Sequence, residues 1–270
     1  MAGSIILLSR ADPSSMLVRR YLVETLGFEP VMAGGREVLR GRGISAVVVD
    51  ALHLRLSEEE IRGLGAELVV VASTHRSESG VKALTTHATG NWTEDADMGG
   101  KPRALSFTMA GAVRAAFDAL RRGVEANSRL GGWWVGLEVT HHGPYSPVPL
   151  IYVEFGGPVE ARIDEAAAAV VAEACIEACS SAPSRSAAIG VGGGHYAPSF
   201  TRLMSGGEYD FGHILPKYAL PDGIELLGQA FERVADGCRL AVLDWKGIQG
   251  EFRGHVLNKL EQLGVEIVKH

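Results

Sequence analysis

Six of the nine histidines fall in segments that the sequence pattern places in loops at strand ends. Such loops carry binding and catalytic groups more often than the elements they connect. Imidazole serves near neutral pH as a general base, a general acid or a metal ligand. A lone histidine is more often structural, but this grouping predicts a shared site. The six are His75, His87, His141, His142, His195 and His213.

The densest segment covers residues 138–154 and reads EVTHHGPYSPVPLIYVE. If its first residues continue a strand, alternation places Glu138 and His142 on one face and His141 on the opposite face. Two adjacent histidines of a strand then do not reach one metal ion from the same face. The segment therefore offers a carboxylate and two imidazoles, divided between two faces.

A second carboxylate follows the proline-rich turn. Residues 150–155 predict a strand, and Glu154 interrupts its otherwise apolar run, with Tyr152 on the same face. A carboxylate is costly to bury without a partner, and a histidine, a metal ion or a substrate amine would each serve. The alternative is an edge strand that leaves Glu154 in water.

Residues 189–201, IGVGGGHYAPSFT, form a second candidate site. Consecutive glycines after a strand let backbone N–H groups approach an anion, and the adjacent His195 is a candidate base or ligand. The loop lacks the Gly-Lys-Ser/Thr ending of a P-loop, and Pro198 is expected to interrupt any helix. An anion cradle and a tight turn are both compatible with it. The glycines are Gly192, Gly193 and Gly194.

Composition excludes several classes of protein. The chain has 270 residues, 46% of them hydrophobic, and a net charge of -6. It is long enough for a substantial core, and the acidic balance is not that of a duplex-binding protein, so no DNA partner is expected. The three cysteines make no disulfide framework, and no apolar segment reaches membrane-spanning length. We expect a cytoplasmic protein without a membrane partner, most simply a monomer. The GxSxG, HExxH and CxxC motifs of serine hydrolases, zincins and zinc ribbons do not occur.

Alternating strands and helices are expected to position these residues. Their alternation predicts an α/β fold with a largely parallel sheet, whose strand carboxyl ends form the ligand crevice. Residues 84–103 have no period and are expected to form a functional loop. The chain is expected to form a single unit, 1–270, and a division into lobes would fall near 95–103 or 127–132. Strands are predicted near 4–9, 44–50, 67–73, 132–140, 150–155, 187–190, 240–245 and 266–268, and helices near 12–26, 108–127, 163–179, 224–234 and 251–263.

Seven motifs follow one another along the chain: STHRSESG (73–80), LTTHATGNW (84–92), GGKPRALSF (99–107), EVTHHGP (138–144), VEFGG (153–157), GVGGGHYAPSFT (190–201) and GHILPKY (212–218). In this order they resemble the archaeal-type D-aminoacyl-tRNA deacylase family, also known as D-tyrosyl-tRNA deacylase of the archaeal and plant type. The THHGP and GGGHYAP cores are the most specific part of the resemblance. Residues 156–164, GGPVEARID, follow Glu154 and depart from the family pattern, so the resemblance does not define the structure that caps this strand. Residues 219–270 carry no matching motif.

The resemblance implies an enzyme that hydrolyses the ester between a D-amino acid and the 3′-terminal adenosine of tRNA. It would release free tRNA and a D-amino acid, with broad side-chain tolerance. The resemblance also implies zinc as cofactor and a three-layer α/β/α sandwich of the phosphorylase/peptidyl-tRNA hydrolase type. The expected partner is the 3′ acceptor end of D-aminoacyl-tRNA.

Hydrolysis of this ester needs a positioned water, a group that takes its proton and a stabiliser of the oxyanion. A zinc ion with an open position would acidify its water. Catalytic roles are expected for His142, His195, Glu154, His75 and Glu138. Metal ligands are expected among His141, His142, His195 and His87. Substrate contacts are expected from Gly192, Gly193, Gly194, Thr140, Arg76 and Lys217, the last two to tRNA phosphate.

Selection of D over L substrates requires a rigid chiral pocket that contacts the α-ammonium group. Glu138 or Glu154 is expected to hold this ammonium. The pocket would exclude an L side chain sterically and leave a D side chain free to vary. Broad tolerance follows if that side chain points toward solvent.

The residues alone leave two other classes open. One is a phosphorylase-like or zinc-dependent hydrolase of a small nucleoside or peptide, which shares the sheet and the anion loop. Nucleoside arsenolysis or amidase activity would favour it. The other is a non-catalytic RNA- or metal-binding module, against which the acidic charge counts. Alanine at His142 or His195 would then change affinity alone.

Overall fold

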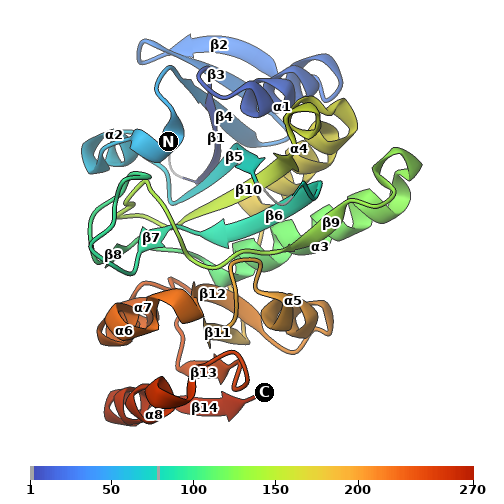
Figure 1. Ribbon diagram of the computed structural model, residues 1–270. Helices are drawn as coiled ribbons and strands as arrows, with labels where there is room; N and C mark the ends of the chain where they lie inside the picture. The colour runs from blue at the N-terminus through green and yellow to red at the C-terminus, as the bar shows by residue number, and fades with distance from the viewer. Residues whose placement is uncertain (1–2, 78–79) are drawn as a thin grey trace.

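The structure of the chain is a computed structural model that describes residues 3–77 and 80–270, so two residues of the STHRSESG motif lie outside the described part. The strands form an eight-stranded mixed sheet, a four-stranded parallel sheet and a two-stranded ribbon (Figure 1). The strands are β1 (Ser4–Ser9), β2 (Glu29–Ala33), β3 (Arg36–Gly41), β4 (Ile44–Val49), β5 (Leu68–Arg76), β6 (Ala83–Ala88), β7 (Gly90–Asn91), β8 (Ala104–Leu105), β9 (Trp134–Leu137), β10 (Leu150–Gly157), β11 (Ala187–Val191), β12 (Asp210–Leu215), β13 (Leu240–Leu243) and β14 (Glu266–Lys269).

Helix α1 shows how local chemistry sets the start of a helix. Helix α1 starts after Asp12, whose carboxylate accepts hydrogen bonds from the amides of Ser14 and Ser15. The α-helices are α1 (Pro13–Glu24), α2 (Glu58–Arg62), α3 (Ala110–Ala126), α4 (Glu165–Cys179), α5 (Pro198–Ser205), α6 (Leu220–Gly223), α7 (Leu227–Glu232) and α8 (Gly250–Leu263). Short 3-10 turns are η1 (His53–Arg55), η2 (Ser128–Leu130), η3 (Val159–Ile163), η4 (Lys217–Ala219) and η5 (Ile224–Leu226).

The eight-stranded sheet has the order β2-β3-β4-β1-β5-β10-β6-β9. Its central strands β4, β1, β5 and β10 run parallel. Along β1, Ile6 and Leu8 join the core under α1, α3 and α4, whereas Ile5 and Leu7 join a second core with Ile61 of α2. The sheet therefore lies between two layers, which confirms the predicted α/β fold with a mostly parallel, mixed sheet.

The second sheet has the order β12-β11-β13-β14, with all four strands parallel. Helix α3 contacts both β6 and β12, and Ala188, Phe211 and Val242 share one core with residues of the first sheet. The sequence predicts one sheet, so the division of the strands between two sheets is a finding of the structure. Strands change sheets between β10 and β11, and lobe boundaries near 95–103 or 127–132 stay predictions.

Two predictions about local structure are wrong. Residues 84–103 include most of β6 and all of β7, and β6 is buried on both faces, so no polar alternation marks it. Pro198 does not interrupt a helix, because it occupies the first turn of α5, where a residue without an N–H group is tolerated. The β2–β3 hairpin is an element that the sequence analysis missed.

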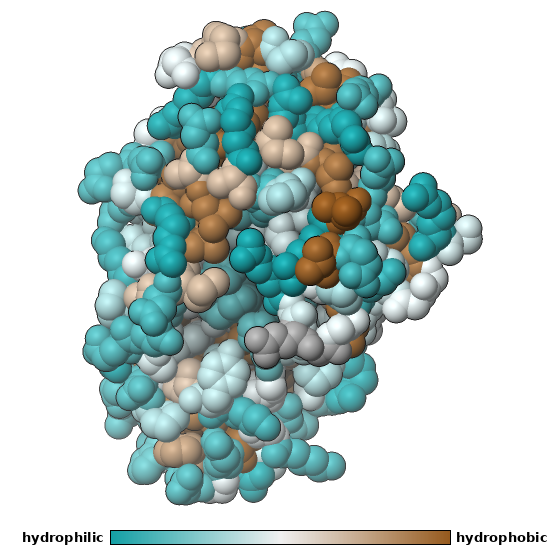
Figure 2. Space-filling model, turned by 45° about the horizontal axis from the view of Figure 1, so that its top comes forward, coloured by the Kyte–Doolittle hydropathy of each residue, from teal (hydrophilic) through white to brown (hydrophobic). Residues whose placement is uncertain are grey.

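The surface is mostly polar on the face shown in Figure 2, with hydrophobic side chains gathered in separate patches. None of the described helices combines the length and the apolar character needed to cross a bilayer. The large apolar side chains that stay exposed include Met32, Val81, Met98, Val159, Ile163 and Tyr218.

Candidate functional site

A cavity of about 430 Å³ opens where β5 and β10 meet the loops that follow β9 and β11. Half of its lining residues are histidines or carboxylates. A cavity with convergent ionisable groups is the usual form of a small-molecule or catalytic site. These lining residues are Asp12, His53, His75, Glu138, His141, His142, Glu154 and His195.

Strand register supplies one wall of the cavity. Tyr152 of β10 pairs with His87 of β6, and Glu154 pairs with Ser73 of β5. Residues opposite each other in a sheet, and residues two apart along a strand, point to the same face. The prediction that Tyr152 and Glu154 share a face is confirmed, and Glu154 is buried rather than in water.

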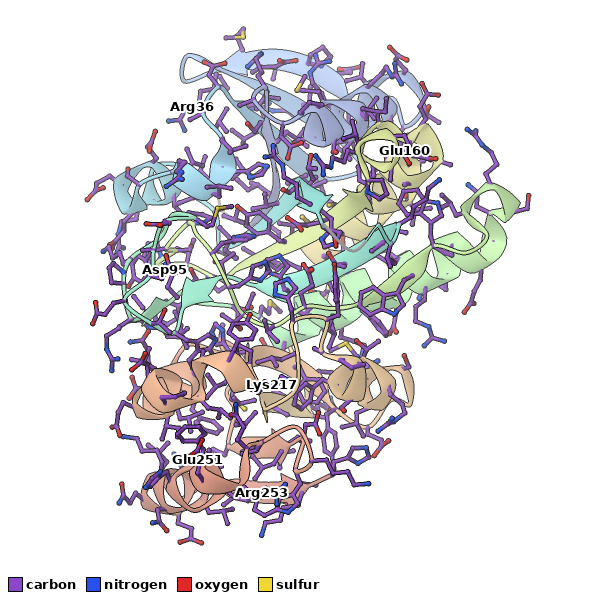
Figure 3. The ribbon with its side chains drawn as sticks, in the orientation of Figure 1. Arg36, Asp95, Glu160, Lys217, Glu251 and Arg253 are labelled. Carbon is purple, nitrogen blue, oxygen red and sulfur yellow. The ribbon has the colours of Figure 1, made fainter. Side chains whose placement is uncertain are left out.

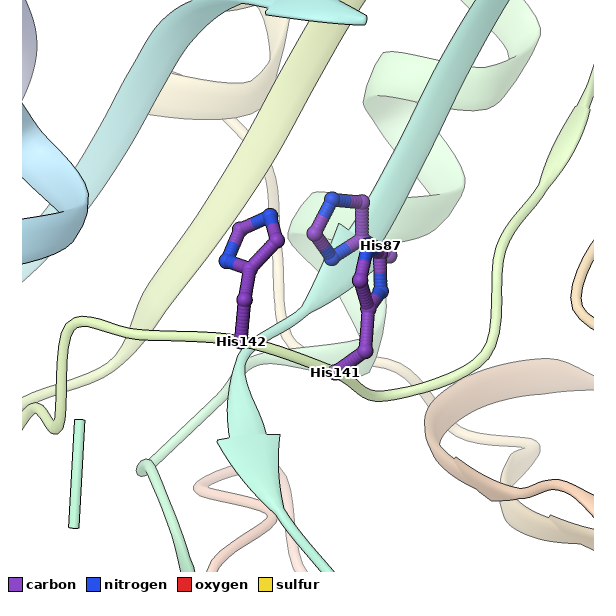
Figure 4. Close-up of side chains that lie close together, drawn as sticks. All are labelled: His87, His141 and His142. Atoms are coloured by element: carbon purple, nitrogen blue, oxygen red, sulfur yellow. The ribbon is translucent and has the colours of Figure 1, made fainter. Parts of the chain in front are cut away.

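The two adjacent histidines follow β9, which ends at Leu137 instead of continuing through Thr140. His142 has φ +39°, in the left-handed region that non-glycine residues rarely adopt. The rings of His141 and His142 lie 4.3 Å apart between centroids, and both lie beside His87 (Figure 4). The prediction of opposite faces is wrong, because the strand has ended and the left-handed residue breaks the alternation.

These three histidines form a donor set that fits a metal ion. Nδ1 of each ring lies 2.6 to 3.0 Å from a backbone carbonyl oxygen. An imidazole held in this way presents Nε2 to a metal. The ligand atoms of His87, His141 and His142 lie within 4.8 Å of one another, and the buried His87 Nε2 has no hydrogen-bond partner among the described residues. Zinc accepts such a set of three histidines.

A second group centres on Glu138. Its Oε1 lies 3.3 Å from His75 Nδ1 and 3.2 Å from His195 Nε2, yet makes no hydrogen bond within the described residues. Oε2 of Glu154 lies 3.7 Å from His75 Nδ1 and 3.8 Å from His87 Nε2. Both carboxylates are thus surrounded by imidazoles, and Glu138 keeps one oxygen available for a ligand.

Burial and charge oppose each other in this group. Burial alone lowers the pKa of His75 and His87, but the neighbouring carboxylates of Glu154 and Glu138 outweigh it and raise these pKa values. Burial raises the pKa of the carboxyl groups, but the imidazoles outweigh it. The pKa of Glu138 is therefore lowered, and that of Glu154 lies well below its usual range. The carboxylates stay ionised beside imidazoles that hold protons tightly.

The other two rings have the opposite tendency. Burial, followed by repulsion from neighbouring imidazoles, lowers the pKa of His141 well below its usual range and that of His142 to about 4. Both rings are therefore neutral at pH 7, which is the form that coordinates metals. His87 must lose its proton to join them, so metal binding is expected to release protons.

His213 lies apart from the other five histidines. Its Nδ1 lies 3.1 Å from Thr140 Oγ1, and its Nε2 lies 3.1 Å from the backbone oxygen of Ser106. Burial lowers the pKa of His213 to about 3. The Thr140 hydroxyl also accepts a hydrogen bond from the Ile214 amide. The side chain of Thr140, for which a substrate contact was predicted, is therefore hydrogen-bonded within the protein.

The glycine loop after β11 has the geometry of a tight turn. The Gly192 amide donates to the Leu215 carbonyl, and a Cβ placed on Gly193 would lie 3.1 Å from Asp244 Oδ2. A carboxylate in this position disfavours an anion held against the glycine backbone itself. Of the two interpretations of this loop, the geometry favours the turn over the anion cradle, for Gly194 as for its neighbours.

The predicted phosphate contacts lie near the cavity mouth. Arg76 is exposed at the end of β5 and lines the cavity. Lys217 is exposed after β12, and the neighbouring Tyr218 hydroxyl lies 3.3 Å from His195 Nδ1. Lys217 therefore lies beside the cavity, one residue from a group that touches it.

Asp12, His53 and Tyr152 also line the cavity and received no role from the sequence. Asp12 Oδ2 lies 3.2 Å from His53 Nε2, and the Tyr152 hydroxyl lies 3.3 Å from His53 Nδ1. All three side chains are buried. Asp12 also accepts a hydrogen bond from the Thr74 amide and so joins α1 to β5. The position of Asp12 just after β1 could have indicated a site residue from the sequence. His53 lies in the short turn η1, which no sequence pattern predicts.

Sequence comparison relates the chain to proteins of known activity. Residues 62–268 match the family model described as D-aminoacyl-tRNA deacylase. The D-aminoacyl-tRNA deacylases of Thermococcus kodakarensis and Pyrococcus horikoshii are each 34% identical to it over 277 residues, covering 98% of this chain and 99% of theirs. The D-aminoacyl-tRNA deacylase of Methanosarcina mazei is 36% identical over 225 residues, covering 83% of this chain and 73% of its own.

Structural comparison agrees over nearly the whole chain. The crystal structure of a conserved protein of unknown function is similar with a TM-score of 0.88 at 27% sequence identity. The similarity covers 99% of this chain and 95% of the other. Both sheets of this chain are therefore part of the shared fold.

Proposed function

The chain belongs to the D-aminoacyl-tRNA deacylase family, and we propose that it hydrolyses the ester bond of D-aminoacyl-tRNA in the cavity lined by histidines and carboxylates. The products are free tRNA and a D-amino acid. The protein is accordingly a hydrolase that acts on a carboxylic ester, and its partner is the 3′ acceptor end of a charged tRNA in the cytoplasm.

The observation that carries this location is the burial of Glu138 and Glu154 among imidazoles in an open cavity. Two buried carboxylates are costly unless their environment compensates them fully. Here the compensation is incomplete, because Glu138 Oε1 and His87 Nε2 have no hydrogen-bond partner among the described residues. Atoms left in this state beside a cavity are suited to bind a ligand.

Proton transfer falls to the Glu138–His195 pair. His195 has 39% of its side chain exposed, and its Nε2 lies 3.2 Å from Glu138 Oε1. The carboxylate of Glu138 lies beside the ring, as the carboxylate does in other acid–base pairs. His195 at the cavity mouth therefore takes the proton of the attacking water and returns it to the leaving 3′-oxygen of the ribose.

His87, His141 and His142 would hold the zinc ion. When bound, zinc supplies an acidified water and stabilises negative charge on the carbonyl oxygen. The neutral state of His141 and His142 at pH 7 suits them for this role. His75 lies beside the two carboxylates. Its raised pKa favours the protonated ring, whose charge offsets theirs.

Stereochemical selection is assigned to the two carboxylates. Glu154 is held by His75 and His87, whereas Glu138 keeps the unpartnered Oε1. The Glu138 oxygen is therefore the better placed of the two to receive the α-ammonium group. With ammonium and carbonyl fixed on opposite sides of the α-carbon, the side chain of a D residue points out of the cavity and that of an L residue meets its wall.

The experiment that tests this function is release of labelled tyrosine from D-Tyr-tRNA and L-Tyr-tRNA by the purified protein. The protein is assayed as isolated, after chelation and after zinc is restored. D-selective release that chelation abolishes and zinc restores supports both the activity and the metal. D-selective release that ignores chelation supports the activity alone, and absence of release from both substrates contradicts the proposed function.

A further inference from the structure

The four-stranded sheet has an edge that leads away from the cavity. Because its strands are all parallel in the order β12-β11-β13-β14, their carboxyl ends meet at one edge. With strands about 4.8 Å apart, this edge is about 14 Å long. One residue marks each strand end along this edge. In spatial order these residues are Lys217 after β12, Gly193 after β11, Trp245 after β13 and Lys269 at the end of β14.

The edge is continuous with the cavity at one end. Tyr218, next to Lys217, places its hydroxyl 3.3 Å from His195 Nδ1. The Lys217 amide donates a hydrogen bond of 2.9 Å to the Gly193 carbonyl oxygen. In Figure 3, Lys217 lies nearer the first sheet than Arg253, which lies near α8 and β14. A linear ligand that enters the cavity can therefore extend along this edge.

The far end of the edge gathers cations around a tryptophan. The guanidinium of Arg253 lies 4.8 Å and the ammonium of Lys269 4.5 Å from the Trp245 ring centroid. Lys246 follows Trp245 and is exposed. Arg202 of α5 contacts the His270 ring at 2.8 Å. Cations fixed by an aromatic ring keep their charge and lose little entropy when an anion binds.

These cations are not neutralised by carboxylates of the described residues, because no ion pair within 4.0 Å joins one to Lys217, Lys246, Arg253, Lys269 or Arg202. Arg253 instead donates to the backbone oxygens of Trp245 and Ile248. By contrast, Lys259 on α8 is paired with Glu225 at 2.7 Å.

Residues 244–253, which include Trp245, Lys246 and Arg253, also contain two carboxylates, Asp244 and Glu251. Asp244 is engaged by the Ser199 hydroxyl at 3.0 Å and by the Gly247 amide at 3.0 Å. Glu251 lies in the first turn of α8. Within residues 244–253 these two carboxylates are matched by Lys246 and Arg253, and Lys217, Lys269 and Arg202 come from other segments, on a chain whose net charge is -6. A local positive strip on an acidic protein is suited to a polyanion that must be placed in one direction.

We propose that this edge, from Lys217 to Lys246 and Lys269, binds the sugar–phosphate backbone of the tRNA next to its aminoacylated 3′ end. The proposal rests on the proposed function, since it takes the terminal ester to lie in the cavity. It gives the C-terminal sheet a role as the surface that orients the acceptor end. Contacts to phosphate position a nucleic acid without reading its sequence, so the edge serves tRNAs of different amino acids.

The test compares the double variant Lys246→Ala/Lys269→Ala with Lys259→Ala, which removes the same kind of charge from the face of α8 that meets η5. Lys246 and Lys269 are exposed and Lys259 is partly exposed, so the fold is expected to be retained in both variants. Hydrolysis of D-Tyr-tRNA is measured from 50 to 300 mM KCl, together with binding of a deacylated tRNA transcript. D-tyrosyl-adenosine ester serves as a substrate that ends before the edge.

The double variant is expected to raise KM for D-Tyr-tRNA about 10-fold with little change in kcat, and to reduce the slope of log(kcat/KM) against log[salt] by about 1 to 2. The ratio of kcat/KM for tRNA to that for the adenosine ester falls accordingly. Lys259→Ala shows neither change. A double variant that matches Lys259→Ala in KM, salt slope and transcript binding overturns the proposal.

The proposed function fails in a distinguishable way. If the unaltered protein hydrolyses neither D-Tyr-tRNA nor the adenosine ester, the deacylase activity is contradicted. Binding of the deacylated transcript by the unaltered protein and the double variant then still decides whether the edge binds RNA. Equal binding of the transcript by both proteins overturns the proposal that the edge binds RNA, and weaker binding by the double variant supports that proposal.

Discussion

The histidines of the cavity and His213 differ in how their ring nitrogens are used. Both nitrogens of His213 contact a partner, Thr140 Oγ1 and the Ser106 backbone oxygen, each at 3.1 Å. His87 has one nitrogen on a backbone oxygen and leaves Nε2 without a hydrogen-bond partner among the described residues. A buried imidazole with both nitrogens engaged holds the fold together, and one with a nitrogen left open beside a cavity is available to a ligand.

The largest expected effect comes from a substitution among the ionisable groups of the cavity. Glu154→Gln removes the charge that stabilises the imidazoles of His75 and His87 and keeps the size of the side chain. We expect the rate of D-Tyr-tRNA hydrolysis to fall about 10³-fold, within the range of acid–base and electrostatic contributions. Rates are measured at saturating substrate, with circular dichroism to verify folding. A folded variant with a rate close to that of the unaltered protein would place the chemistry elsewhere.

A second prediction addresses the structural side. His213→Ala leaves Thr140 and the Ser106 carbonyl without their buried partner and opens a cavity next to Trp92. We expect the free energy of unfolding to fall by about 3 kcal/mol, measured by urea denaturation at pH 7. Hydrolysis by the folded fraction is expected to stay within about 3-fold of the original. A large loss of rate with unchanged stability would give His213 a part in the reaction.

The pH dependence of stability sharpens the same contrast. Burial lowers the pKa of His213 to about 3, below its unfolded value of about 6.5. Between these values the unfolded chain binds more protons than the folded one, so stability is lost as pH falls below about 6.5. His213→Gln removes this contribution and is expected to flatten the slope of stability against pH by up to about 1.4 kcal/mol per pH unit. Urea denaturation of chelated protein from pH 4 to 7 measures the slope, and equal slopes for both proteins would contradict the shift.

The smallest expected effect concerns Trp92, which packs edge-on against His213 and donates from Nε1 to the Thr140 carbonyl oxygen at 3.1 Å. Trp92→Phe removes this donor and keeps an aromatic ring. We expect a loss of about 1 kcal/mol of stability and no change in D over L selection. Loss of selection in this variant would show that the backbone at Thr140 sets the shape of the cavity, contrary to the division drawn above.

The sequence predicts the α/β class, the strands β1, β4, β5 and β10, and most of the histidines and carboxylates that line the cavity. It places His87 and His213 in loops, although both lie in strands, because β6 and β12 are buried on both faces and lack the alternation that marks a half-exposed strand. The approach of His141 to His142 depends on the left-handed φ of His142 and on the end of β9 at Leu137, neither of which a residue pattern shows. The second sheet depends on long-range pairing, which local patterns do not determine.

The role of the cavity is tested most directly by the initial rates of tyrosine release from D-Tyr-tRNA and L-Tyr-tRNA, measured side by side for the unaltered protein, Glu154→Gln and His213→Gln. We predict D-selective release by the unaltered protein and by His213→Gln, and a loss of about 10³-fold in Glu154→Gln alone. Equal rates for D and L substrates, or a Glu154→Gln variant that retains D-selective release, would contradict the assignment of the reaction to this cavity.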